Sequence, residues 1–170
     1  HGFCGDWIGE DRLVLPLLNQ AGEESEGQEQ RYLSTWSTET GKMVTKVSTP
    51  SMSAFAASFD ARWVAEAGMD KRIRIRNANT MEVEREFRAH DSEVTAVLWH
   101  PKRPLLVSIA SNCVRIWSTE TWHMMEELHM EDYNPDALRF YITGDGKGLV
   151  RKKQKTPSSI ELYTPESFSK

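Results

Sequence analysis

The sequence predicts an all-β fold in which one small unit is repeated four times. Three observations support this prediction: a seven-residue segment recurs at a near-constant spacing, short β-type apolar runs lie between its copies, and no stretch has a helical period. The recurring segments begin at Trp36, Arg76, Trp117 and Tyr163, so they are spaced by 40, 41 and 46 residues. A period near forty residues is typical of repeat proteins whose units stack on one another.

Each copy also has a turn followed by a strand upstream of the recurring segment. The equivalent turn positions are Asp11, Asp60, Lys102 and Asp145, and the first step between them is the longest. Residues 19–30 account for the extra length. They are rich in Glu, Gln and Gly, a composition that buries little apolar surface and predicts a flexible insertion.

Four short β-type runs fill the third copy, at residues 94–99, 105–109, 113–117 and 122–128. Each is bounded by Pro, Gly, Asp or Ser, as strands joined by turns usually are. In the second copy, arginines alternate with isoleucines over residues 72–76, which is the two-residue period of a strand.

Four antiparallel strands in every forty residues are typical of the blades of a β-propeller. The approximate blade boundaries are 1–47, 53–88, 94–129 and 137–170. A single blade cannot bury both of its faces, so each blade is expected to pack on the next.

Composition and charge exclude several classes of protein. The 170 residues carry a net charge of −4, which gives no strong attraction to nucleic acid or acidic membranes. There is no run of eighteen apolar residues and no signal segment, although the first residue, His1, indicates a processed or cut piece. Two cysteines, Cys4 and Cys113, are too few for a disulfide framework and are expected to be buried thiols. We therefore expect an intracellular location, cytoplasmic with the nucleus as the alternative.

The third copy resembles a WD40 repeat. Ala89-His90 stands where that family has Gly-His, and Trp117-Ser118 stands where it has Trp-Asp. In the second copy, Asp70 occupies the family's acidic turn position. The resemblance covers essentially the whole chain and is strongest over residues 43–129. It implies a ring of about seven blades, so these four are expected to be a fragment of a larger ring. A four-bladed ring and assembly from several chains are the alternatives.

The resemblance also implies a hydrogen-bonded network inside each blade. It joins a His before the first strand, a Ser or Thr on the second strand, an Asp in the next turn and a Trp on the third strand. The residues of the third copy at these positions are His90, Ser108, Asn112 and Trp117.

The other copies depart further from this network. The second copy keeps Asp70 but has Thr49 and Arg76 at the His and Trp positions. The first copy has only Trp36, and the fourth has Tyr163 and no histidine. No copy has the complete set, so each blade is expected to be modestly stable.

No group of residues predicts a catalytic, cofactor or metal site. His90 has no acidic partner in register and no nucleophile nearby, so we expect it to brace its blade. No histidine has metal-ligand spacing with Cys or Asp, although His123 and His129 share one face of an outer strand. Residues 144–148 match the hairpin turn of the other copies and precede a strand, which excludes a phosphate-binding loop. The basic run at 151–155 is expected to be a solvated edge or loop.

The loops before each first strand and between the second and third strands are expected to gather on one rim. The candidate partner-binding residues there are Met52, Met69, Lys71, Asp91, Glu93 and Ser111. The leading hypothesis is a non-enzymatic scaffold that binds proteins or peptides through these loops. The missing blades or an oligomeric partner are expected to cover its open ends.

Two further hypotheses concern catalysis. The blades resemble accessory domains of larger signalling enzymes or nucleotide-dependent switch proteins, whose chemistry would lie outside this chain. A propeller hydrolase would need clustered acids or a nucleophile around the central channel. The first strands offer Ala, Ser, Val and Thr there, so no cofactor and no enzymatic activity is expected.

Overall fold

The computed structural model of the chain describes residues 5–18, 30–49, 51–111, 113–130, 140–152 and 160–168. These residues form fifteen β-strands and one short 3-10 helix, η2 (Glu166–Phe168), which confirms the predicted all-β fold. The described part of the chain has no helix of the length and apolarity that a membrane span requires.

The strands form four antiparallel sheets, which we call blades 1 to 4, and neighbours in each sheet follow one another in sequence. Blade 1 contains β1 (Asp6–Ile8), β2 (Arg12–Leu18), β3 (Arg31–Ser37) and β4 (Met43–Ser48). Blade 2 contains β5 (Met52–Ala57), β6 (Trp63–Gly68), β7 (Arg72–Asn77) and β8 (Val83–Arg88). Blade 3 contains β9 (Ala96–Trp99), β10 (Leu105–Ala110), β11 (Cys113–Ser118) and β12 (Met124–His129). Blade 4 contains β13 (Phe140–Ile142), β14 (Leu149–Lys152) and β15 (Ile160–Tyr163).

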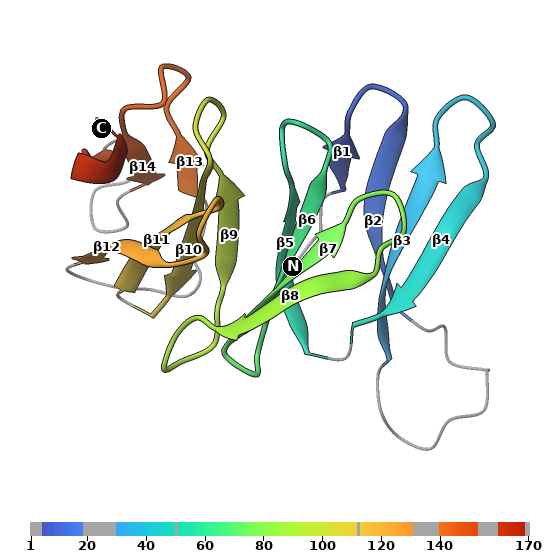
Figure 1. Ribbon diagram of the computed structural model, residues 1–170, viewed down its shortest axis with the longest axis horizontal. Helices are drawn as coiled ribbons and strands as arrows, with labels where there is room; N and C mark the ends of the chain where they lie inside the picture. The colour runs from blue at the N-terminus through green and yellow to red at the C-terminus, as the bar shows by residue number, and fades with distance from the viewer. Residues whose placement is uncertain are drawn as a thin grey trace.

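The blades follow one another side by side in chain order (Figure 1). The first strand of each blade contacts the first strand of the next, in the pairs β1–β5, β5–β9 and β9–β13. First strands therefore lie on the inside and later strands on the outside, as in a propeller. Two loop edges result, one above and one below the sheets.

The recurring segments occupy equivalent places in the first three blades. The register between the third and fourth strands shifts directly before Trp36, Arg76 and Trp117. Five residues later, each chain segment has one residue with positive φ, between 60° and 64°, at Gly41, Met81 and Trp122. A shared bulge and a shared left-handed residue show that the sequence period is a structural period.

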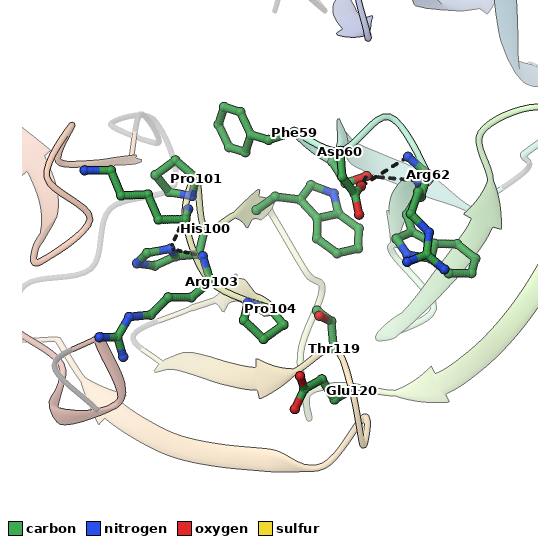
Figure 2. A pocket seen from close by; sticks show the side chains of 13 residues that line it. Phe59, Asp60, Arg62, His100, Pro101, Arg103, Pro104, Thr119 and Glu120 are labelled. Atoms are coloured by element: carbon green, nitrogen blue, oxygen red, sulfur yellow. Dashed lines mark hydrogen bonds between the residues drawn. The ribbon is translucent and has the colours of Figure 1, made fainter.

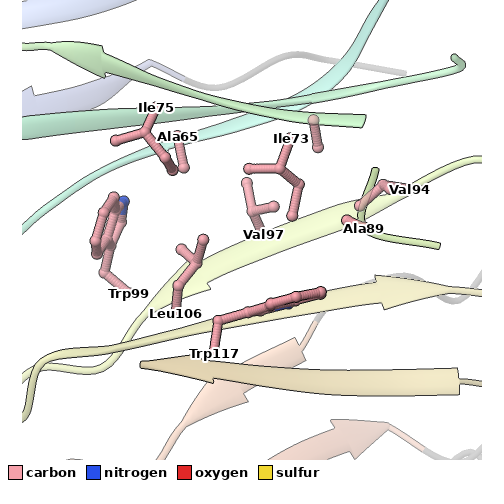
Figure 3. Packing of buried hydrophobic residues seen from close by; sticks show 10 residues of the cluster. Ala65, Ile73, Ile75, Ala89, Val94, Val97, Trp99, Leu106 and Trp117 are labelled. Atoms are coloured by element: carbon pink, nitrogen blue, oxygen red, sulfur yellow. The ribbon is translucent and has the colours of Figure 1, made fainter. Parts of the chain in front are cut away.

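The core lies between the blades. Three separate clusters of buried apolar residues each join neighbouring blades. In the cluster between blades 2 and 3, Ile73 and Ile75 face Val97, Leu106 and Trp117 (Figure 3). Blades 2 and 3 thus bury apolar residues on both faces of their sheets, which explains why their inner strands are nearly continuous apolar runs.

The end of blade 4 differs from the sequence-based expectation. Four strands in each blade predict a fourth strand near the end of blade 4, but Phe168 ends η2. The Glu126 carboxylate accepts hydrogen bonds from the backbone N–H groups of Glu166 and Ser167, at 3.1 and 2.8 Å. Phe168 is buried and packs edge-on against the His100 ring at 4.8 Å between centroids. The short helix therefore docks on blade 3.

Candidate functional site

Blade 3 contains a buried network of His90, Ser108 and Trp117. His90 Nε2 lies 2.7 Å from the Ser108 hydroxyl oxygen, and Trp117 Nε1 donates to the same oxygen at 2.8 Å. Burial, and then the positive charge of Arg115, lower the pKa of His90 to about 4. The imidazole is therefore neutral at pH 7. A neutral ring that is enclosed in the blade and bonded to Ser108 braces the blade. Asn112, the fourth residue that was expected in this network, lies outside the described residues.

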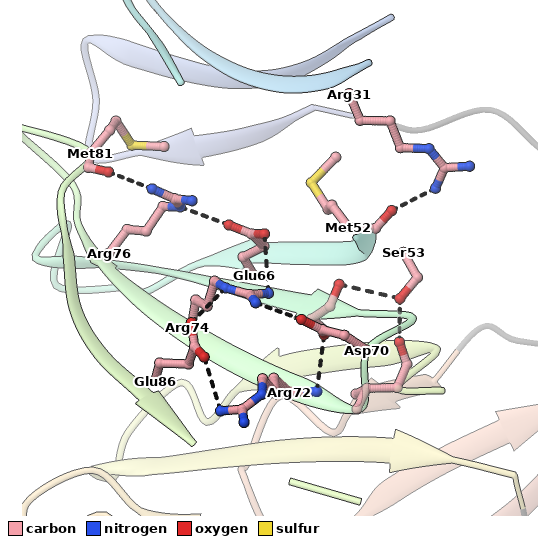
Figure 4. Close-up of polar contacts among 12 residues, drawn as sticks. Arg31, Met52, Ser53, Glu66, Asp70, Arg72, Arg74, Arg76, Met81 and Glu86 are labelled. Carbon is pink, nitrogen blue, oxygen red and sulfur yellow. Dashed lines mark hydrogen bonds and ion pairs between the residues drawn. The ribbon is translucent and has the colours of Figure 1, made fainter. Parts of the chain in front are cut away.

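Blade 2 has an ionic network at the corresponding positions (Figure 4). Arg76 Nε donates to the Glu66 carboxylate at 2.7 Å, and its Nη1 donates to the Met81 carbonyl at 2.8 Å. Burial raises the pKa of Glu66, and the guanidinium groups of Arg76 and Arg74 oppose this effect. The Thr49 hydroxyl, at the position expected for His, is buried without a hydrogen-bond partner.

Asp70 joins this ionic network and does not contact His90. It accepts from the Arg74 guanidinium at 2.5 Å and from the Arg72 backbone N–H at 3.2 Å. Burial alone raises the pKa of Asp70, but these hydrogen bonds outweigh it and the pKa is lowered. Arg74 also donates to Glu86 on the outer strand at 2.9 Å. These bonds hold neighbouring strands of blade 2 together, although Arg74 Nη1, like the Thr49 hydroxyl, is buried without a hydrogen-bond partner.

Blades 1 and 4 have further variants of the same interaction. In blade 1, Trp36 Nε1 donates to the Ser34 hydroxyl at 2.8 Å. In blade 4, Arg151 Nε and the Tyr163 hydroxyl both donate to the Glu161 carboxylate at 2.8 Å. Arg151 is buried, so the prediction of a solvated basic run is wrong for this residue. Residues 153–155 of that run lie outside the described residues.

All six residues that are expected on the rim lie in or beside the turns of one loop edge, and five of them are exposed or partly exposed. Met69 is 45% exposed, and Asp91 and Glu93 are also exposed. Asp91 accepts a hydrogen bond from Arg88 at 3.2 Å. Lys71 and Ser111 are partly exposed in the hairpin turns between second and third strands. These five residues are called the rim below.

Met52 is the exception and corrects the prediction. Met52 is the first residue of β5, and its side chain points into the cluster between blades 1 and 2. It is therefore only 1% exposed. Its carbonyl accepts from Arg31 Nη1 at 2.6 Å, which ties the start of blade 2 to blade 1. Its place beside a loop predicts that this methionine is available to partners, but the strand begins at that residue.

The opposite loop edge has a pocket that the sequence did not predict. It has a volume of about 610 Å³ and lies between the β5–β6 turn, the β9–β10 turn and the β11–β12 turn (Figure 2). Phe59, which is 71% exposed, stands at its mouth. The remaining lining residues are Ser58, Asp60, Arg62, Trp63, Trp99, His100, Pro101, Lys102, Arg103, Pro104, Thr119 and Glu120. Aromatic and proline surfaces therefore alternate with charged groups.

Hydrogen bonds fix the walls of this pocket. The Asp60 carboxylate accepts from the Ser58 hydroxyl at 2.6 Å and from the Arg62 backbone N–H at 3.1 Å. His100 Nδ1 accepts from the backbone N–H groups of Lys102 and Arg103 at 3.1 and 3.0 Å. Two of the three turns contain the equivalent turn positions Asp60 and Lys102 that recur upstream of the repeated segments. The sequence thus predicts these turns, but turn residues alone do not reveal a cavity between them.

Three side chains of types that can ligate a metal also come together in blade 3. Cys113, Glu127 and His129 offer ligand atoms that all lie within 4.8 Å of one another. Spacing along one strand did not predict this group, because Cys113 and His129 meet across two strands.

The comparisons with known proteins agree with this geometry. Residues 81–118 match the family described as "WD domain, G-beta repeat". Pre-mRNA-processing factor 19 of mouse and that of rat are each 24% identical to this chain over 87 residues. The match covers 51% of this chain and 17% of each relative.

A chain in the crystal structure of the mitotic checkpoint complex has the same fold, with a TM-score of 0.72 and 13% identity. The superposition covers 96% of this chain and 48% of that chain. The repeat match places a WD40 repeat at residues 81–118, and the blade architecture and the equivalent bulges show a β-propeller fold built from units of this kind.

Proposed function

We propose that this chain is a non-enzymatic scaffold that binds other proteins or peptides through its two loop edges. The observation that carries this proposal is the use of the interior polar groups. His90, Glu66 and Arg151 each bond to partners within their own blade and brace it. Buried groups committed in this way have no access to a substrate.

The two loop edges supply the surface for binding. The rim combines an exposed Met69 with Lys71, Asp91 and Glu93, and the opposite edge combines Phe59 with Lys102 and Glu120. Aromatic and methionine side chains are enriched at protein-binding surfaces, which have a polar rim. The WD40 propeller family is generally non-catalytic, and loops on a rigid scaffold usually carry binding.

The relatives suggest where to look for partners. Pre-mRNA-processing factor 19 is named for the processing of pre-mRNA, and the structural neighbour is a chain of the mitotic checkpoint complex. We infer that this chain is an intracellular scaffold and that its role is to assemble with protein partners. The nucleus and the cytoplasm are both compartments in which to test this.

Cross-linking mass spectrometry on the tagged protein would test the proposal with two paired variants. Phe59→Ser with Lys102→Glu alters the pocket edge, and Met69→Ser with Lys71→Glu alters the rim. We expect at least one pair to remove a defined set of partner cross-links while circular dichroism stays unchanged. Glu39→Gln, in the exposed β3–β4 turn of blade 1, is the control. The proposal would be overturned if neither pair of substitutions changed the partner cross-links and if the protein turned over a small molecule in a reaction that His90→Gln abolished.

A further inference from the structure

The two outer strands of blade 3 place a cysteine, a histidine and a glutamate on one face. In the β11–β12 register, Cys113 is opposite His129, and Arg115 is opposite Glu127. Residues two apart on a strand point to the same side, so these four side chains form one surface cluster. Cys113 Sγ, a Glu127 oxygen and a His129 nitrogen all lie within 4.8 Å of one another.

The Glu127 carboxylate is held so that one oxygen remains directed at the cluster. Its Oε2 accepts from Arg115 Nε at 2.6 Å, and its Oε1 lies 3.3 Å from His129 Nε2. Arg115 is itself fixed, because its Nη1 donates to the Ala89 carbonyl at 2.7 Å. This arrangement resembles the outer-shell hydrogen bonds that orient metal-binding carboxylates.

Blade 2 provides an internal comparison. At the equivalent register, Arg74 donates to Glu86 at 2.9 Å, so the Arg–Glu pair is a brace that both blades share. The positions of Cys113 and His129, however, are occupied there by Arg72 and Arg88. In blade 1 they are occupied by Tyr32 and Ser48. Blade architecture therefore does not require the cysteine–histidine pair.

We propose that Cys113, Glu127 and His129 bind a zinc ion on the outer surface of blade 3. Thiolate sulfur, imidazole nitrogen and carboxylate oxygen are the ligand atoms that zinc takes in proteins. At the usual zinc–ligand distances, atoms of a tetrahedral site lie about 3.5 Å apart, so the side chains here need shifts of only about 1 Å. His129 is 72% exposed and lies on β12, the edge strand of this sheet in the described part of the chain, so its ring can make this shift.

Charge and protonation are consistent with this site. A thiolate and a carboxylate together neutralise the two positive charges of zinc. Zinc replaces the thiol proton of Cys113 when the sulfur–zinc bond forms. One proton is released to solvent per ion bound, so affinity rises with pH. Three protein ligands leave the fourth position to water or to a ligand from a partner.

Cobalt substitution in the 170-residue chain tests this proposal. A Cys4→Ser background leaves Cys113 as the single cysteine. We expect one Co²⁺ per chain, with a thiolate-to-cobalt charge-transfer band that zinc abolishes on addition. Cys113→Ser should remove the band, and His129→Asn or Glu127→Gln should each weaken binding by at least about tenfold. His123→Asn, on the turn before the same strand, is the matched control and should leave binding unchanged.

A measurement on the unsubstituted site guards against a variant that fails to fold. In the Cys4→Ser chain, zinc should slow alkylation of Cys113 by iodoacetamide by at least about tenfold, and more strongly at pH 8 than at pH 6. An alkylation rate that zinc leaves unchanged overturns the proposal. The proposal is also overturned if the Cys113→Ser and His129→Asn variants bind zinc as tightly as the parent chain does. Equal affinities would indicate an adventitious ion only.

Discussion

Glu66 and Arg76 form a buried ion pair 2.7 Å long in blade 2, at the positions where blade 3 has Ser108 and Trp117. The same two strand positions thus carry either a charged pair or a neutral hydroxyl–indole pair. A neutral hydrogen bond costs little desolvation, whereas two buried charges must offset a large desolvation cost through their mutual attraction. The two blades therefore have the same architecture, but the loss of one partner should cost more stability in the charged pair of blade 2 than in the neutral pair of blade 3.

Glu66→Gln is expected to destabilise the chain strongly. It leaves the Arg76 guanidinium buried without a charged partner, and breaking a buried pair in this way costs about 3 kcal/mol or more. Urea unfolding at pH 7 measures this free energy. The double variant Glu66→Ser with Arg76→Trp installs the hydroxyl–indole pair of blade 3. It should lose less stability than Glu66→Ser alone or Arg76→Trp alone. A cost below about 1 kcal/mol for Glu66→Gln would show that the ion pair is not what holds blade 2.

His90 should make the stability of the chain fall in mild acid. Its pKa is lowered from 6.5 to about 4, so the unfolded chain binds a proton between these pH values and the folded chain does not. The contribution is complete above pH 6.5 and is lost as the pH falls toward 4. Between pH 7 and pH 5 this corresponds to about 2 kcal/mol.

Comparison with His90→Gln isolates this contribution, because the pKa of His100 is also lowered and acts in the same direction. Urea unfolding of both chains at several pH values gives the two slopes. The parent should lose more stability than His90→Gln by the amount above. Parallel curves would mean that the imidazole titrates alike in the folded and unfolded chains.

Two glycines of one turn provide a matched test of the contact between blades 3 and 4. Gly146 has φ +76°, and a Cβ there would lie 2.7 Å from His100 Cε1, while a Cβ on Gly144 would meet nothing within 4 Å. The Gly146 carbonyl also accepts from His100 Nε2 at 2.8 Å. Gly146→Ala should cost about 1–3 kcal/mol, and Gly144→Ala should cost much less. Hydrogen exchange over residues 140–152 would locate the effect in blade 4.

Strand content and repeat equivalence were predictable from the sequence because both depend on local pattern. Alternation over residues 72–76 and the recurring segments at Trp36 and Trp117 determine where strands and bulges lie. The blade-bracing role of His90 followed from the resemblance and is supported by its bond to Ser108. The Glu66–Arg76 pair was missed because a glutamate inside an apolar strand has no visible partner until β6 and β7 are in register.

The surface features were harder to predict because they depend on contacts between distant turns or strands. The pocket beside Phe59 needs three turns from two blades, and the approach of Cys113 to His129 needs the exact β11–β12 register. The basic neighbours of Arg151 in the sequence predict exposure to solvent. Its partner, Glu161, lies ten residues away on the next strand.

Two methionines separate a structural role from a binding role. Met52 is fully enclosed between blades 1 and 2, so Met52→Ala leaves a cavity and should destabilise the chain by about 2–3 kcal/mol. Met69 is 45% exposed on the rim, so Met69→Ala should change stability by no more than about 0.5 kcal/mol. Thermal unfolding of both variants checks these values. If the rim binds a partner, Met69→Ala should weaken that binding at unchanged stability, whereas Met52→Ala should weaken it only in proportion to the fraction unfolded. Equal losses of stability would mean that Met69 is also part of the core.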